Sequence, residues 1–453
     1  MNTVVVDFYL PHLREAIIEL EKAGVIKNKF WLVDPKYNDG TVPSMHNNMI
    51  CQEDIHEYYT FIPDDIYDNI HESIYRFMNI ENRWVNSIEL ADYVHDFNVL
   101  SCFWYGVFYR NNVDLLIMGN APHCPVPFVA YLVAKAMHLK IIVCEQIYQL
   151  RNSFICADSI DTMGNVKINL DVHENENLKL KKEFKKDLFY MKDKSPLLLA
   201  SERRLSSIIH NFNLLKKRKY DIDFVYKGME KIGYCLISKK LESYFKRHRD
   251  EKCQEILPTD KYVYFPLHLQ PEMTTDTLGG VYEDQLLAIE RLRRIIPNEW
   301  YIYIKENPKQ TYYKRSKKFF ERLSLIPNVK IVYPNTNTWD LTANSQFVAT
   351  ITGTVGWEAI TGGKNVLIFG NAWYRTLPGV FEYKNDFNLQ NILNYKISHE
   401  DLEVKFNDFM RKICVGVVAG DDFEEFNPNF EEKTNNEQVF NSLKVVIKKW
   451  YKQ

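Results

Sequence analysis

Paired cysteines are the first feature that this sequence lacks. It has 8 cysteines in 453 residues, and no two of them are spaced as C-x-x-C. Closely spaced cysteines usually mark zinc sites, and regular sets of them mark disulfide frameworks. We therefore expect no bound metal and no disulfide scaffold, and we predict a protein of a reducing, cytoplasmic compartment.

Long apolar runs are also missing. No stretch of about 18 apolar residues occurs, and a membrane-spanning helix needs a stretch of that length. Residues 1–7 show no basic segment followed by a long apolar one, so we expect no secretory signal. The predicted location is cytoplasmic, with the inner face of the bacterial membrane as a possible peripheral site.

A charge excess of either sign is absent as well. The chain has 57 Lys and Arg against 59 Asp and Glu, for a formal net charge of -2. A general nucleic-acid binder should be basic, so nucleic acid is not an expected partner. With 46% hydrophobic residues, a chain of this length can bury a large core and is expected to form more than one domain.

Apolar runs of strand length alternate with helical patterns in two regions of the chain. The expected strands of the first region are residues 3–9, 29–33, 114–118 and 140–144, and those of the second are 262–265, 300–304, 329–332, 346–349 and 365–370. Such alternation predicts an α/β fold with parallel sheets. We expect two Rossmann-like domains that face a cleft. The predicted N-terminal domain, residues 1–177, binds the acceptor, and the predicted C-terminal domain, residues 258–420, binds the nucleotide sugar. A basic helical insertion or linker is predicted at 178–257, and a tail helix at 421–453.

The insertion has its own composition. Lys and Arg alternate with apolar residues in 178–182, 216–220 and 244–249, a pattern that predicts amphipathic helices with a basic outer face. Such a face is usually only solvated, but it can also contact an anionic membrane or glycan. The C-terminal helix expected at 439–451 has the same two alternatives, since it could pack on the body of the protein or rest on a membrane.

The most informative motif follows the expected strand 346–349. A turn rich in Gly and Thr leads into a helix, and backbone N–H groups, hydroxyls and the helix dipole all favour an anion there. The motif has neither the GxxxxGK[ST] nor the GxGxxG spacing, so it predicts a nucleotide pocket of another kind. Its expected nucleotide-binding residues are Thr352, Gly353, Thr354, Gly356 and Glu358, the last for a ribose diol.

Two more loops follow strands of the second region, and we expect them to converge on this turn. The first offers His268, Gln270, Glu272, Thr274 and Thr275, and the second offers Lys305, Asn307 and Pro308. Lys305 and the turn amides could stabilise a phosphate leaving group without metal. Glu272 is the candidate nucleophile and His268 the candidate proton shuttle. Alternatively His268 is structural, and Glu272 only caps the next helix.

Polar residues also follow the strands of the first region. Asn120, His123 and Glu145 lie at the carboxyl ends of the strands expected at 114–118 and 140–144, where ligands bind in open α/β sheets. We interpret them as acceptor-site residues. The alternative is that Asn120 and His123 only build a turn and cap a helix.

Three motifs together resemble one family. Thr352–Ala359 resembles the [ST]-x-[ST]-x-G-[FW]-E-A signature of bacterial capsule polysaccharide biosynthesis proteins, the Kdo-transferase-like group. Residues 265–272 resemble that group's loop with Pro, Gln and an acid, and residues 305–308 resemble its Lys-x-His-Pro motif. The resemblance covers about residues 261–381.

The resemblance implies a GT-B fold, a CMP-activated 2-keto sugar acid as donor substrate, no cofactor or metal, and transfer with retention. It assigns Glu272 to the nucleophile loop, Lys305 and Asn307 to the phosphate, and the turn residues to CMP. Asn307 stands where the family usually has His, so it can donate a hydrogen bond but not a proton. The loop has one acid rather than a cluster, which favours a nonulosonic acid such as pseudaminic, legionaminic or sialic acid over Kdo.

The expected partners are this CMP-sugar and a glycan or lipid-linked glycan acceptor on the way to the cell surface. Two other functions stay open on the sequence. A GT-B enzyme acting on a UDP-sugar, either a hexosyltransferase or an epimerase, would share the glycine turn. A non-catalytic component of capsule assembly or export would share the fold without the chemistry.

Overall fold

The computed structural model describes residues 1–7, 11–33, 45–46, 49–50, 52–82, 90–173, 178–185, 240–312, 314–419 and 430–451. The chain forms two compact units. The larger unit comprises Met1–Lys185, Pro271–Asp284 and Val348–Gln453, and the smaller unit comprises Lys186–Gln270 and Gln285–Phe347. Each unit is described by itself below.

The larger unit contains a six-stranded sheet with the strand order β14-β7-β6-β5-β1-β2. Its strands are β1 Asn2–Asp7, β2 Lys27–Val33, β5 Leu115–Met118, β6 Lys140–Gln146, β7 Ser153–Ala157 and β14 Cys414–Val415. The four strands β2, β1, β5 and β6 run parallel, whereas β7 pairs antiparallel with both β6 and β14. Each parallel strand contains a continuous apolar run, 4–6 in β1, 30–33 in β2, 115–118 in β5 and 141–144 in β6, as expected for strands that are covered on both faces.

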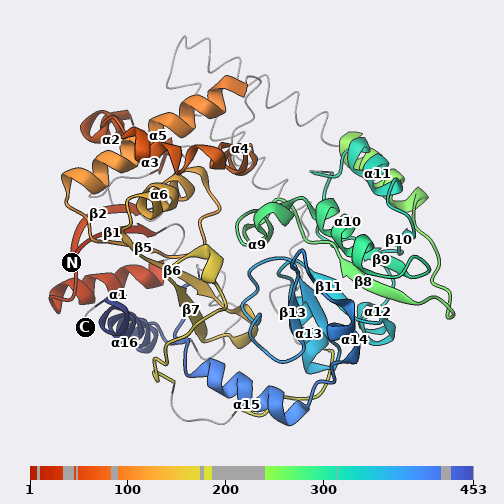
Figure 1. The fold of residues 1–453 in the computed structure, drawn as a ribbon. Coiled ribbons are helices and arrows are strands. Elements are labelled where there is room, and N and C mark those ends of the chain that lie inside the picture. Colours follow the sequence, from red (N-terminus) through yellow and green to blue (C-terminus); the bar gives the residue numbers. More distant parts are fainter. Residues whose placement is uncertain are drawn as a thin grey trace. The chain divides into compact units, whose positions relative to one another are not determined.

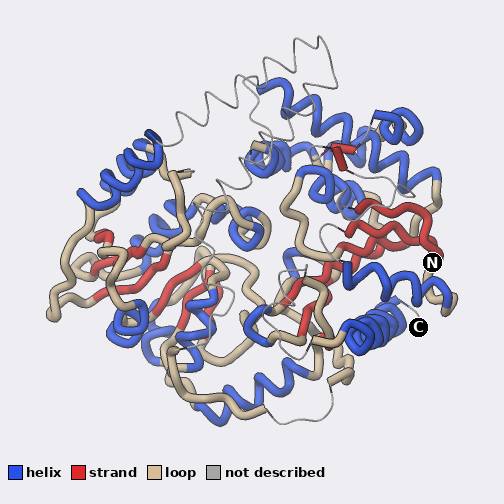
Figure 2. The backbone as a smooth tube through the Cα atoms, turned by 180° about the vertical axis from the view of Figure 1, so that it is seen from behind, coloured by secondary structure: helices blue, strands red, loops and turns tan. Residues whose placement is uncertain are grey.

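Helices from both ends of the chain pack on this sheet. They include α1 Pro11–Lys22, α5 Leu90–Arg110, α6 Pro125–Ala136 and α16 Glu432–Tyr451. Figure 1 shows α1 and α16 side by side, and in Figure 2 the helix at the C mark lies next to the helix nearest the N mark. Val439, Leu443 and Ile447 of α16 are fully buried in the same core cluster as Leu13 and Ile17 of α1. The C-terminal helix therefore packs on the body, one of its two predicted alternatives.

Shorter elements join α1, β2 and α5. They are β3 Met45–His46, β4 Met49–Ile50, α2 Gln52–Tyr58, α3 Asp64–Asp68, the 3-10 turn η2 His71–Ser73 and α4 Ile74–Glu81. Two more 3-10 turns, η3 Tyr148–Leu150 and η4 Ile160–Thr162, flank β7.

The larger unit also contains the segment around the glycine turn. Its elements are α9 Met273–Asp276, the 3-10 turn η6 Gly280–Glu283, β11 Val348–Thr350, α13 Thr354–Thr361, β12 Val366–Ile368, β13 Val380–Glu382, α14 Leu389–Asn394 and α15 His399–Met410. Strands β11, β12 and β13 pair in parallel, in that order. Residues of β11 and β12 are fully or nearly fully buried, so the turn after β11 starts from a rigid base.

The smaller unit has parallel strands in the order β10-β9-β8. Its elements are a helix over 240–251, β8 Tyr262–Pro266, α10 Gln285–Ile295, β9 Tyr301–Lys305, α11 Lys317–Ser324, β10 Val329–Ile331 and α12 Thr338–Asn344. The strands again alternate with helices, so the predicted α/β class with parallel-dominated sheets is confirmed in both regions of the chain. The predicted domain boundaries remain predictions.

One local prediction needs correction. Residues 178–185 form no helix, because their backbone is held by side chains: Asn407 bonds both the N–H and the C=O of Leu178, and Thr361 donates to the C=O of Glu183. Helix α10 begins at Gln285, after the turn η6. The basic helix expected around 244–249 is present, and the stretch 216–220 lies outside the described residues.

Candidate functional site

The turn predicted to bind a nucleotide leads directly from β11 into α13. Gly353 is the N-cap residue of α13 and has extended backbone angles, φ -66° and ψ 151°. Its N–H donates to Oγ1 of Thr350 at 3.3 Å, and its C=O accepts the N–H of Gly356 at 3.0 Å. The end of the strand and the first helical turn therefore fix each other, and the strand-turn-helix order read from the sequence is correct.

A buried tyrosine fills the space beneath this turn. The hydroxyl of Tyr374 donates to the C=O of Gly353 at 2.5 Å, and its side chain is fully buried. A Cβ atom on Gly356 would lie 2.1 Å from Oη of Tyr374. Burial, and then the charge of Glu358, raises the pKa of Tyr374, so its hydroxyl keeps its proton. Packing against Tyr374 therefore accounts for glycine at position 356. The contact of Gly356 with a nucleotide stays a prediction.

The structure also defines the surroundings of two other residues of the motif. Glu358 lies in the second turn of α13 and is only 4% exposed, so a ribose contact from it stays a prediction. Oγ1 of Thr354 accepts a hydrogen bond from Nε2 of Gln149 at 3.0 Å. That bond ties the first residue of α13 to the segment that follows β6.

The loop that carries Glu272 is bonded directly to this turn. Oγ1 of Thr352 donates to the C=O of Thr274 at 3.2 Å, and Oγ1 of Thr274 donates to Oε2 of Glu272 at 3.0 Å. Glu272 is half-buried, and it immediately precedes α9. Its backbone C=O accepts the N–H groups of Thr275 and Asp276, so it also begins that short helix, as the structural alternative had it.

The same loop is anchored at its far side. Oγ1 of Thr277 donates to the C=O of Pro122 at 2.7 Å, and Arg76 donates to the C=O of Thr277 at 2.8 Å. Thr275, two positions earlier in the loop, is fully buried. The two bonds of Thr277 hold the loop against Pro122, which follows β5, and against Arg76 of α4.

Glu145 lies at the end of β6 and is electrostatically coupled to Glu272. It is 8% exposed, and its Oε2 accepts the N–H of Ala121 at 3.1 Å. Burial raises the pKa of Glu145 to about 8; the bond from Ala121 opposes this rise, and the charge of Glu272 adds to it. The larger unit therefore pairs one carboxyl that is protonated near neutral pH with a second carboxyl nearby.

The other two residues predicted for the acceptor help to build the turn after β5. Nδ1 of His123 lies 3.0 Å from the carbonyl oxygen of Ala121, and Asn120 is partly exposed in the same turn. This geometry fits the structural alternative, and an acceptor role for either residue stays a prediction.

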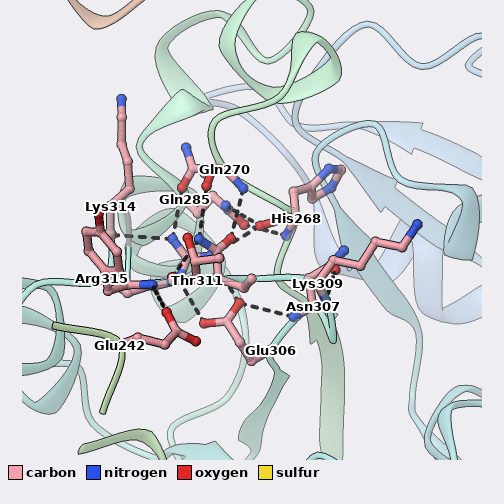
Figure 3. Close-up of polar contacts among 12 residues, drawn as sticks. Glu242, His268, Gln270, Gln285, Glu306, Asn307, Lys309, Thr311, Lys314 and Arg315 are labelled. Carbon is pink, nitrogen blue, oxygen red and sulfur yellow. Dashed lines mark hydrogen bonds and ion pairs between the residues drawn. The ribbon is translucent and has the colours of Figure 1, made fainter. Parts of the chain in front are cut away.

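In the smaller unit, the loops after β8 and β9 share one buried ion pair (Figure 3). Arg315, at 1% exposure, donates from Nε to Oε2 of Glu306 at 2.7 Å. It also donates to Oε1 of Gln270 at 3.0 Å and to the C=O of His268 at 3.2 Å. The two predicted loop residues thus lie on a network that the sequence analysis did not anticipate.

His268 is a neutral imidazole at neutral pH. Burial lowers its pKa to about 4, and the charge of Arg315 lowers it further. A proton shuttle works best when its pKa lies near the working pH. The structure therefore favours a hydrogen-bonding role for His268 over the predicted proton transfer.

Lys305 and Asn307 lie at the end of β9 and just beyond it. Nζ of Lys305 donates to the C=O of Thr336 at 2.5 Å and to Oγ1 of Thr338 at 3.0 Å, and burial lowers its pKa. Oδ1 of Asn307 accepts the N–H of Lys309 at 2.9 Å. Among the described residues, no hydrogen bond uses Nδ2 of Asn307. Pro308 follows as an exposed turn residue.

The predicted residues therefore form two sets. The larger unit joins Glu272, Thr274 and Thr275 to the glycine turn, and the smaller unit joins His268 and Gln270 to the 305–307 loop. Tyr374 and Arg315 were not predicted from the sequence, since neither lies in a motif. Among the described residues, no group of three or more His, Cys, Asp or Glu side chains is placed to hold a metal ion. None of the described helices combines the length and apolar composition that crossing a membrane requires.

A family model described as "Capsule polysaccharide biosynthesis protein" matches residues 177–392. Among curated proteins, no sequence matches this chain. The match confirms the family resemblance that the motifs carry.

Solved structures that are similar to this chain share little sequence with it. The Thermosulfurimonas dismutans KpsC beta Kdo 2,7 transferase is 10% identical, with 97% of this chain and 99% of that chain covered and a TM-score of 0.36. The beta Kdo 2,4 transferase of the same KpsC is 13% identical over 67% and 82%, with a TM-score of 0.29. The UDP-GlcNAc 2-epimerase of Methanocaldococcus jannaschii is 11% identical over 89% and 92%, with a TM-score of 0.23. TM-scores below 0.5 do not establish a common fold, so these likenesses assign no activity.

The packing of Gly356 against Tyr374 gives a test of the turn. We expect Gly356→Ala to destabilise the protein by about 1–3 kcal/mol, because the added methyl group overpacks a closed site. In a Tyr374→Leu background the same substitution should cost much less, since the ring that it meets is gone. Thermal midpoints of the four proteins in this cycle measure the coupling. Equal losses in both backgrounds would show that Tyr374 does not set the turn.

Proposed function

We propose that this chain, whose residues 177–392 match a family model described as "Capsule polysaccharide biosynthesis protein", is a glycosyltransferase of capsule synthesis that transfers a sugar acid from its CMP donor. One observation supports the chemistry most strongly. Glu272, the nucleophile candidate, is hydrogen-bonded through Thr274 to the turn at the N-terminus of α13, and its charge acts on the buried Glu145.

The turn supplies the donor end of the proposed reaction. The first N–H groups of a helix and the helix dipole favour an anion, and the hydroxyls of Thr352 and Thr354 lie in the same turn. The CMP phosphate is the anion that we assign there. Lys305 and Asn307 keep the phosphate roles that the family resemblance implies, and Nδ2 of Asn307 can still donate a hydrogen bond.

In the first proposed step, an oxygen of Glu272 attacks the anomeric carbon of the sugar acid. The bond between that carbon and the phosphate oxygen breaks, its electron pair leaves with CMP, and a glycosyl ester on Glu272 results. A phosphate monoester is a good leaving group without protonation, so this step needs stabilised charge rather than an acid. Two inversions of this kind give net retention.

In the second proposed step, the acceptor hydroxyl attacks the same carbon and Glu145 accepts its proton. The bond between that carbon and the Glu272 oxygen breaks, and its electron pair returns to the Glu272 carboxylate. Glu272 has no negative charge while it is esterified. The contribution of that charge to the raised pKa of Glu145 is then lost, and the carboxylate form of Glu145 becomes more populated when a base is needed. The bond from the N–H of Ala121 to Glu145 favours the same ionised form.

The proposal also keeps the other predicted residues and partners. We keep Asn120, His123 and Gln270 as acceptor-side candidates and Kdo or a nonulosonic acid as the donor sugar. The basic face of the helix over 240–251 stays the candidate for contact with an anionic membrane or a lipid-linked acceptor. A metal-independent reaction stays a prediction of the family resemblance.

The donor class can be tested by nucleotide binding. CMP should raise the thermal midpoint by several degrees at 1 mM, since a ligand that binds only the folded state stabilises it by mass action. UDP and GDP at the same concentration should have little effect. A shift with UDP or GDP but not with CMP would overturn the proposed donor class.

The two carboxyl roles can be separated by the release of CMP. Glu272→Gln should abolish both the first burst of CMP and steady turnover. Glu145→Gln should keep a burst of about one CMP per enzyme and lower steady turnover by about 10²–10⁴-fold, because only the second step needs the base. Glu283→Gln is the matched control, since it changes a buried carboxyl of the same segment that bonds Asn79. A normal burst in Glu272→Gln would remove Glu272 from the nucleophile role.

A further inference from the structure

Arg315 is a buried charge that lies outside every motif. Its side chain is fully buried, and the side chain of Glu306 is 5% exposed. The two form a fork, with Nε to Oε2 at 2.7 Å and Nη2 to Oε1 at 3.2 Å. A bidentate pair of this kind fixes direction as well as distance, which a lysine ammonium cannot do.

All N–H donors of the Arg315 guanidinium group are engaged in hydrogen bonds. Its remaining N–H groups donate to Oε1 of Gln270 at 3.0 Å, to the C=O of His268 at 3.2 Å and to the C=O of Lys314 at 3.4 Å. Together with the fork to Glu306, these bonds engage all five N–H donors that an arginine side chain has. One charged group therefore specifies positions in both loops, as Figure 3 shows.

Two glutamine side chains also bond the backbone of the loop that follows β8. Gln285 accepts the N–H of His268 at 2.7 Å and donates to its C=O at 3.0 Å. Gln310 does the same for Gln270, at 2.8 Å and 2.9 Å. The backbone groups of His268 and Gln270 are thus satisfied by side chains, whereas the N–H of Leu267 donates to the C=O of Lys305 in β9 at 2.8 Å. Arg315 bonds both His268 and Gln270.

The second loop is held through Glu306. Its Oε1 accepts the N–H of Asn307 at 3.0 Å as well as the bond from Arg315. Lys305 and Asn307, the two predicted phosphate contacts, flank Glu306 in the chain. A shift of the Glu306 carboxylate would therefore move the backbone between them.

The residue before Arg315 has an unusual backbone conformation. Lys314 has a positive φ of 57°, which non-glycine residues adopt at some cost. The guanidinium carbon Cζ of Arg315 lies over the ring of Phe319, 4.6 Å from its centroid.

We propose that Arg315 is a positioning residue for the transfer reaction. Its guanidinium holds the loop of His268 and Gln270 and the loop of Lys305 and Asn307 in one fixed geometry. The inference rests on the proposed function in so far as these loops contact the donor. It goes beyond that function by placing the control of both loops in a residue that touches no substrate.

The matched control is Arg293, a second buried arginine of the smaller unit. It donates to the carbonyl oxygens of Ile296, Pro297 and Trp300, all in the connection between α10 and β9, and it bonds none of the predicted site residues. Arg293→Lys and Arg315→Lys remove the same guanidinium from a buried site. The two variants differ in the segments whose hydrogen bonds are lost, because Arg315 bonds the two candidate loops and Arg293 does not.

The test compares amide hydrogen exchange and kinetics in these two variants. Arg315→Lys should speed exchange at least tenfold in peptides covering 266–272 and 305–311, whose reporter amides include those of His268, Gln270 and Asn307. It should also lower kcat/KM for the donor at least tenfold at a temperature well below its thermal midpoint. Arg293→Lys should leave both quantities within about twofold of the unmodified protein, even if its thermal midpoint falls equally.

Exchange within twofold in Arg315→Lys, or the same effects in Arg293→Lys, would overturn the inference. If Arg315→Lys does not fold, the double variant Glu306→Gln with Arg315→Met removes the unpaired charge and is expected to show the same loop-specific exchange. Exchange needs no substrate. If the unmodified protein transfers no CMP-sugar, the proposed function fails, while the exchange result still decides whether Arg315 positions the loops.

Discussion

The hydrogen bond from Thr352 to the carbonyl oxygen of Thr274 joins the two elements on which the proposed chemistry depends. One of these is the amide-rich turn at the start of α13, and the other is the loop that carries Glu272. A bond of this kind contributes only about 0.5–1.5 kcal/mol to stability. Its importance is geometric, because it holds a carboxyl group beside a helix N-terminus that favours an anion.

Buried polar groups surround both candidate loops, and such groups destabilise a protein unless they are fully paired. Tyr374 meets this condition through Gly353, and Arg315 meets it with five donors and a carboxylate partner. Apolar residues of similar size would often be at least as stabilising at such positions. Their role in this protein is therefore better explained by the geometry that they specify than by the energy that they add.

The titration of the carboxyl groups follows from the same packing. Glu145 is buried at the end of a parallel strand, where the peptide group of Ala121 and the charge of Glu272 act on it in opposite directions. His268 is buried beside a fixed positive charge and stays neutral. The fold thus raises the pKa of one carboxyl to about 8 and lowers the pKa of one imidazole to about 4. Neither shift was visible in the order of residues.

Sequence patterns predicted the alternation of strands and helices well, because the buried strands are continuous apolar runs. They also placed the glycine turn correctly between β11 and α13. They did not predict α5 as an element, since nearly all of residues 100–108 are buried and the helical period there is weak. Residues 178–185 were predicted as helix, but tertiary bonds from Asn407 and Thr361 override the local pattern.

Of the candidate site, the motifs identified residue types and loops but not the groups that hold them. Tyr374 is 18 positions from Gly356 and Arg315 is 45 from Gln270, so only the fold brings these residues into contact. The link between Glu145 and Glu272 spans a still longer stretch of chain. Such pairings are tertiary, and no periodicity or spacing within one segment encodes them.

The most direct test of the account is to identify the residue that becomes glycosylated. The protein would be incubated with CMP-Kdo and, separately, with CMP-activated nonulosonic acids, without acceptor, and then acid-quenched and mapped by peptide mass spectrometry. The account predicts the mass of one sugar acid on the peptide that contains Glu272, with the ester on that residue. The same mass on a different side chain, or turnover of a UDP-sugar with no reaction of any CMP-sugar, would contradict it.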